Sequence, residues 1–153
     1  MTDSVLLDDT DPVPLVLARL RADQRLTDLL ARAGGHVSGE RAAPWPCLEV
    51  SAGADNVVNA RAGLVMAGVA LDLHEAFDDS TGPWMLRRIL KAAVAAITSM
   101  ADTDPAGQDP AAPVVVGADA SGSIYRVSTT VGQARLSASV ILTMAPAQAP
   151  SLP

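Results

Sequence analysis

The sequence predicts an α+β fold, a two-layer sandwich in which a mostly antiparallel sheet packs against a central helix and an N-terminal helix. Helical periodicity marks residues 12–33 and 83–100, and alternating strand patterns lie between these segments and after them. The chain is 49% hydrophobic but only 3% aromatic, so aliphatic side chains must form the core. Helices that precede and interrupt runs of strands are typical of helices gathered on one face of a sheet.

The 153 residues suffice for one domain with its own core, which we place at residues 12–145. Residues 1–11 contain four aspartates and no base, which predicts a flexible acidic tail. Three prolines among residues 146–153 keep this C-terminal tail out of a regular sheet.

The N-terminal helical segment divides into two helices with separate caps. Asp11 can cap the first helix, and Pro12 suits its first turn because a proline lacks the N–H that would be unpaired there. Asp23 can cap the second helix, which ends at Gly34 and Gly35, residues that permit a left-handed exit. The apolar positions of the two helices are Val13, Val16, Leu17, Leu20, Leu26, Leu29 and Leu30.

A connection and a short strand follow. Residues 36–46 are polar and proline-interrupted, so we expect a linking segment with at most a short extended piece. Residues 47–51 alternate as a strand does, and residues 52–60 are predicted to form a loop. Val57 and Val58 would be exposed in such a loop, which suggests that a partner covers them.

Residues 64–77 form the longest predicted strand, with the odd-numbered positions from Val65 to Leu73 facing the core. The central helix begins at Pro83, with a capping hydroxyl available just upstream, and ends near Met100. Its apolar stripe consists of Leu86, Ile89, Leu90, Ala93, Val94, Ile97 and Met100.

The last third of the chain is predicted to complete the sheet. Residues 101–113 have the composition of a solvated loop, and residues 114–116 form a short strand. A turn follows at residues 117–122. Residues 124–131 and 134–145 then form a hairpin, the second strand of which carries alternating aliphatic residues.

The charge balance argues against a nucleic-acid-binding face. The net charge is −6 and the pI is near 4.6, whereas affinity for phosphate comes from clustered bases. An acidic surface is compatible with a lumen through which DNA slides without binding. Charged residues make up only 18% of the chain, which suggests that other subunits cover part of its surface. No apolar run is long enough to span a membrane, and the acidic start does not resemble a signal peptide.

Motifs for catalysis, metal binding or cofactor binding are missing from the sequence, so we expect no enzyme and no cofactor. Asp72, His74 and Glu75 are the best metal candidates, but two ligands on one strand face do not make a site, and a solvated strand face is the favoured interpretation. Cys47 is the only cysteine, which excludes a CxxC site and favours a small buried hydrophobe. Neither a P-loop, a GxGxxG motif nor a GxSxG elbow occurs.

A small basic group offers a candidate subunit interface. The cations are Arg87, Arg88 and Lys91 on the central helix, with Arg126 and Arg135 on the last hairpin. They are either ordinary solvated charges or contacts to acids of a neighbouring subunit, to which arginine can form bidentate bonds.

The order of elements and several loose motifs resemble the tail terminator (tail completion) proteins of long-tailed bacteriophages. The opening matches L-x-A-D-x-x-L-x-x-L-L at residues 20–30, and the likeness spans residues 12–145. The segments that carry it are LARLRAD at 17–23, LTDLL at 26–30, GGHV at 34–37, PCLEV at 46–50 and VALDLH at 69–74, with the central helix and the last hairpin.

The resemblance implies a structural protein of the virion neck, assembled in the host cytoplasm. Members of this family form a six-subunit ring that caps the tail-tube protein, ends its polymerisation and offers its other face to head-closure or connector proteins. DNA would then pass the lumen without specific binding. The alternatives are another head-closure or connector protein, and a small host α+β domain that binds a ligand.

Overall fold

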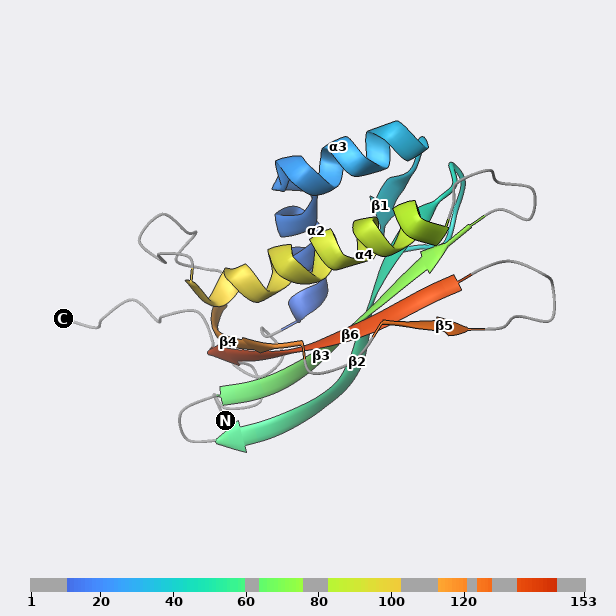
Figure 1. The fold of residues 1–153 in the computed structure, drawn as a ribbon. Helices are drawn as coiled ribbons and strands as arrows, with labels where there is room; N and C mark the ends of the chain where they lie inside the picture. The colour runs from blue at the N-terminus through green and yellow to red at the C-terminus, as the bar shows by residue number, and fades with distance from the viewer. Residues whose placement is uncertain are drawn as a thin grey trace.

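Three helices lie on one face of a six-stranded sheet in the computed structural model, which describes residues 11–59, 64–75, 83–102, 113–120, 124–127 and 135–145 (Figure 1). The helices are α2 (Pro12–Ala22), α3 (Gln24–Ala33) and α4 (Pro83–Thr98), and the 3-10 turn η1 (Ser99–Asp102) continues α4. The strands are β1 (His36–Ser38), β2 (Cys47–Asn59), β3 (Leu64–His74), β4 (Val114–Asp119), β5 (Tyr125–Val127) and β6 (Arg135–Ala145).

The sheet has the strand order β1-β2-β3-β6-β4, and β5 pairs with β6 beside β4. Only the β1–β2 pair is parallel among these strands, and every other pair is antiparallel. One open sheet face with helices on the other confirms the predicted α+β sandwich.

The two opening helices begin at the predicted N-cap residues. The side chain of Asp11 accepts a hydrogen bond from the Val13 amide at 3.0 Å, and that of Asp23 accepts one from the Leu26 amide at 2.9 Å. Each bond satisfies a donor that the first turn of a helix leaves unpaired. Gly34 ends α3 with φ of 76°, in the left-handed region that glycine adopts without a Cβ clash.

The core lies between the helices and the sheet and is aliphatic, as predicted. The odd-numbered residues of β3 from Val65 to Leu73 are buried, while the even-numbered residues from Leu64 to Asp72 are half-buried. Leu90 and Ile97 of α4 are both fully buried. The β6 residues that meet them are Leu136, Ala138, Val140, Leu142 and Met144, all of them buried.

The predicted loop at residues 52–60 is wrong, because β2 continues to Asn59. β3 is long enough to supply partners along this stretch, so Val57 lies opposite Val65 in the sheet. Register shifts after Ala52 and after Val57 mark irregular pairing, which breaks the alternation that sequence analysis needs. Val58 therefore belongs to a strand as well, although its side chain lies outside the described residues.

The short extended piece expected in the linking segment is a strand, and two other boundaries differ from the prediction. The linking segment contains β1, whose parallel pairing with β2 was not foreseen. β4 extends three residues beyond 116, so part of the predicted turn is strand. The central helix changes to 3-10 geometry after Thr98, and η1 occupies the start of the predicted loop at 101–113.

Candidate interface on the helical layer

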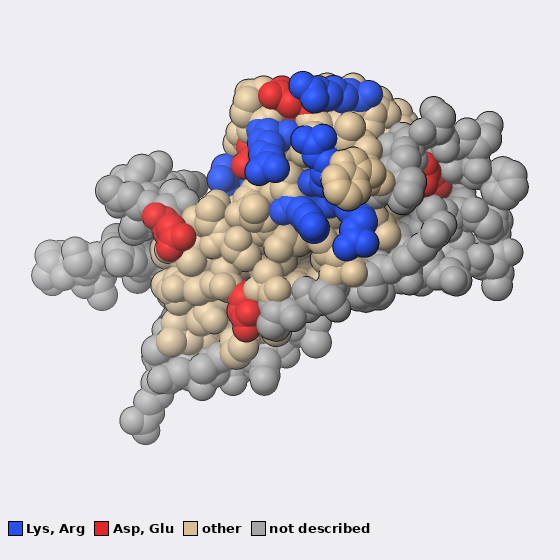
Figure 2. Space-filling view, viewed as in Figure 1, with Lys and Arg blue, Asp and Glu red and all other residues tan. Residues whose placement is uncertain are grey.

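Exposed cations of two helices gather on the outer side of the helical layer (Figure 2). α3 and α4 contact each other, which brings together residues that are more than fifty positions apart in the sequence. We define the basic helical face as Arg25 and Arg32 of α3 with Arg87, Arg88 and Lys91 of α4, all of which are exposed. The structure thus unites three of the predicted interface residues with two that were not predicted.

Helix geometry explains why these side chains point outward. In α4 the apolar stripe from Leu86 to Ile97 packs on the sheet, so the opposite side must face solvent. Trp84, Arg88 and Lys91 follow one another at spacings of four and three residues, which places them in one row. Trp84 is 76% exposed and belongs to the same side as the cations.

The helical layer and the remainder of the chain have opposite charge. α2, α3 and α4 together contain seven of the eleven cations and one of the seventeen acids. The remainder, with four cations and sixteen acids, carries the acidity of the protein. The net charge of −6 therefore combines three basic helices with a remainder of the sequence that is acidic.

The five cations of the basic helical face form no ion pair with another described residue. The one acid within these helices, Asp28, accepts a hydrogen bond from Gln24 at 2.8 Å. Arginine and lysine side chains in this state are hydrated and available to an acidic partner.

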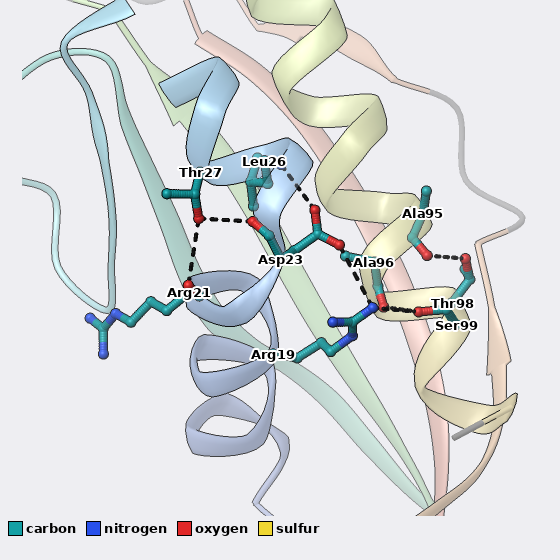
Figure 3. A network of polar contacts seen from close by, with 9 residues as sticks. All are labelled: Arg19, Arg21, Asp23, Leu26, Thr27, Ala95, Ala96, Thr98 and Ser99. Carbon is teal, nitrogen blue, oxygen red and sulfur yellow. Dashed lines mark hydrogen bonds and ion pairs between the residues drawn. The ribbon is translucent and has the colours of Figure 1, made fainter. Parts of the chain in front are cut away.

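One arginine of the same layer has a different environment (Figure 3). Arg19 of α2 donates from Nη2 to Ser99 Oγ at 3.1 Å, and the same nitrogen lies 3.7 Å from Asp23 Oδ2. Ser99 in turn donates to the Ala96 carbonyl at 2.7 Å. This network ties the α2–α3 junction to the end of α4, so the elements that carry the basic helical face are held together.

The remaining predicted interface residues lie in the sheet. Arg126 of β5 is opposite Leu136, and Arg135 of β6 is opposite His74. Val57 and Val58 lie on β2, and the side chains of all four predicted residues lie outside the described part of the chain. The structure therefore does not unite them with the basic helical face.

The predicted solvated strand face around His74 is wrong. His74 is only 4% exposed, and its Nε2 lies 3.0 Å from Glu49 Oε1 of the neighbouring strand. Asp72 accepts a hydrogen bond from Ser137 of β6, and Glu75 is buried. The neighbouring strands β2 and β6 thus supply polar partners for His74 and Asp72. No three potential metal ligands lie together among the described residues.

The structure places His36 beside Cys47, which sequence reasoning could not do. The parallel β1–β2 pairing sets these two residues opposite each other, with Cys47 Sγ 4.0 Å from His36 Nε2. The thiol donates to the Glu40 carbonyl at 3.5 Å. Burial raises the pKa of Cys47, and the charge of Glu49 raises it further. The resting thiol is therefore neutral, unlike the thiolate that nucleophilic catalysis requires.

A cavity of about 320 Å³ lies where α2 and α3 meet β1. Leu20, Leu30 and Val37 form apolar walls, and Arg21 and His36 also line it. Its volume is at the lower end of the range for ligand pockets. If the chain were a small ligand-binding domain, the alternative function, its ligand would bind in this cavity.

No protein-family model matches the chain, and no curated protein matches it. No described helix is long and apolar enough to cross a membrane.

Two members of the basic helical face were missed by sequence reasoning. Arg25 and Arg32 are seven residues apart, so helical periodicity predicts that they lie on one side of α3. Their approach to α4 was not readable, because it depends on how α3 and α4 pack.

Proposed function

We propose that the chain is a structural tail terminator of a long-tailed bacteriophage. Six copies would form a ring that caps the tail tube, ends its polymerisation and joins the tail to the head-closure proteins. The observation that carries the proposal is the element order, with two capped helices, a long antiparallel strand pair, one central helix and a closing group of strands. This is the order on which the resemblance rests.

The open face of the sheet supports an assembling protein. Along β3 this face carries Leu64, Met66, Gly68 and Ala70, and along β6 it carries Ile141, which is 37% exposed. Figure 1 shows no helix on this side. The same face also carries Asp72 of β3 with Ser139 and Thr143 of β6, so it is a mixed surface of small, apolar and polar side chains, as interfaces between chains commonly are.

The separation of charge supports a ring that lets DNA pass. If the basic layers face neighbouring subunits, the acidic remainder lines the lumen and repels the phosphate backbone. Such a protein needs no cofactor, membrane or catalytic residue. Its place would be the neck of the virion, after assembly in the host cytoplasm.

The test is polymerisation of the cognate tail-tube protein with and without the purified chain. We expect negative-stain microscopy to show rings of this protein alone, and tubes that stop growing and carry a ring at one end when it is added. A protein that stays monomeric at high concentration and leaves tube growth unchanged would contradict the proposal. Rings that bind head-closure protein but not tubes would favour the neighbouring neck proteins instead.

A further inference from the structure

The charges of α4 have signs that its own dipole does not favour. The helix has no acid in its first turn and no base in its last, while Arg87 and Arg88 lie in its second turn. Asp102 follows at the other end, in η1. Because a helix end is stabilised by charge of the opposite sign, these residues gain nothing locally from their positions. The helix dipole therefore does not account for where these charges lie.

Two basic helical faces cannot join each other symmetrically. A two-fold contact sets the same patch of both copies face to face, and each patch contributes five cations without an ion pair to a described residue. Like charges brought together across an interface oppose association. A second copy must therefore meet this face with a different surface.

The sheet offers a surface that could complement the basic helical face, because it carries an acid and exposed apolar side chains. Asp119 of β4 lies opposite Ile141 of β6, so the two side chains share one face of the sheet. Val116 lies on the same strand three residues before Asp119, at an irregularity of the β4–β6 pairing. Asp119 is exposed and forms no ion pair with a described residue, and Asp102 lies on η1, which packs against β4. We define Val116, Asp119 and Ile141 as the β4 face.

The exposed apolar side chains divide between the same two surfaces. Among the described residues the exposed large hydrophobic side chains are Trp84 at 76%, Val116 at 52% and Ile141 at 37%. Trp84 stands in a row with two cations, Ile141 lies opposite Asp119, and Val116 precedes this acid by three residues on β4. Tryptophan and arginine are the residue types that most often dominate binding energy at interfaces.

We propose that the basic helical face of one copy binds the β4 face of a second copy, head to tail. Trp84 packs on Val116 and Ile141, while Arg88 and Lys91 pair with Asp119. A contact between different surfaces leaves one free face at each end of a dimer, so assembly continues until a ring closes or a filament grows. This inference rests on the proposed function, because it identifies the closed ring with the terminator ring.

The experiment compares the unmodified full chain with two surface variants and two control variants. The first variant, Arg88→Glu with Lys91→Glu, reverses the basic helical face, and the second, Asp119→Arg, reverses the β4 face. Arg41→Glu and Glu40→Arg are matched controls, because both residues are exposed and lie outside the two surfaces. Circular dichroism and thermal melts verify that each variant is folded.

Sedimentation velocity and mass photometry give the assembly state. We expect each reversal to weaken assembly at least about tenfold, and the controls to assemble like the unmodified chain. Raising the salt from about 0.05 M to about 0.5 M should weaken assembly of the unmodified chain. A mixture of the two reversed variants should assemble more strongly than either variant alone, because each unmodified surface finds its partner and the two reversed surfaces carry opposite charges.

The outcomes separate the inference from the proposed function. Rings that persist in both reversed variants would overturn the inference and leave the terminator proposal standing. A mixture of variants that assembles no more strongly than either variant alone would also overturn the inference. If the unmodified chain neither assembles nor stops tube growth, both fail. Retention of a DNA duplex by the unmodified chain but not by the first variant would assign the basic helical face to nucleic acid instead.

Discussion

Arg19 and Arg88 lie in the same helical layer but differ in their contacts: one is bonded to neighbouring helices and the other is exposed. Arg19 is held between Ser99 and Asp23, with its side chain 33% exposed. Arg88 is exposed and forms no ion pair with a described residue. The inner seam of the layer, where α2, α3 and α4 meet, uses polar groups to fix the helices to one another. The outer face carries cations that these internal contacts leave available.

Residue type alone does not locate an interface in this layer. Both arginines belong to amphipathic helices, and both lie outside the buried stripe of their helix. The direction in which the neighbouring helix packs decides which of them becomes internal. The following substitutions test whether the seam stabilises the fold independently of the outer face.

The largest effect is expected from the core side of α4. Leu90→Ala removes a fully buried side chain between the helices and the sheet, and we expect the free energy of unfolding to fall by about 2–5 kcal/mol. Lys91→Ala, one residue further along the same helix, should change it by no more than about 0.5 kcal/mol. Urea denaturation followed by circular dichroism measures both. A loss for Lys91→Ala comparable with that for Leu90→Ala would show that the outer face also holds the fold together.

A smaller effect is expected at the seam. Asp23→Ala removes the cap of α3 and the carboxylate beside Arg19, so we expect a loss of about 1–2 kcal/mol. Asp28→Ala removes an exposed acid of the same helix whose side chain accepts a hydrogen bond from Gln24, and should cost less than about 0.5 kcal/mol.

The matched pair isolates the cap, because both substitutions remove one negative charge. If both cost the same, the stabilisation would come from net charge rather than from the bonds that Asp23 makes. Repeating the melts in high salt provides a second control, since a cap bond is screened less than an exposed charge.

Local chemistry made much of the fold predictable. Asp11, Asp23 and Gly34 act within a few residues of themselves, and the strict alternation from Val65 to Leu73 shows directly which face is buried. The second half of β2 was missed because its pairing is irregular, and pairing to β3 rather than sequence pattern makes it a strand.

The candidate site was only half predictable for a related reason. Helical periodicity places Arg87, Arg88 and Lys91 on one side of α4, but no local signal shows that α3 lies alongside. The burial of His74 likewise depends on Glu49, which is distant in the sequence and close in the sheet. Contacts between distant segments are what the sequence of one chain does not display.

The smallest effect is expected from the bond between Arg19 and Ser99. A double-mutant cycle with Arg19→Ala and Ser99→Ala should give a coupling free energy of about 0.5–1.5 kcal/mol, because the bond is partly shielded from water. Arg21→Ala is the matched control, since Arg21 is exposed and makes one long bond of 3.4 Å to the Val37 carbonyl. Assembly should be unchanged in Arg19→Ala at a protein concentration where the Arg88→Glu, Lys91→Glu variant loses its rings. If Arg19→Ala disrupts assembly equally while remaining folded, the seam belongs to the interface and the separation between the two arginines is wrong.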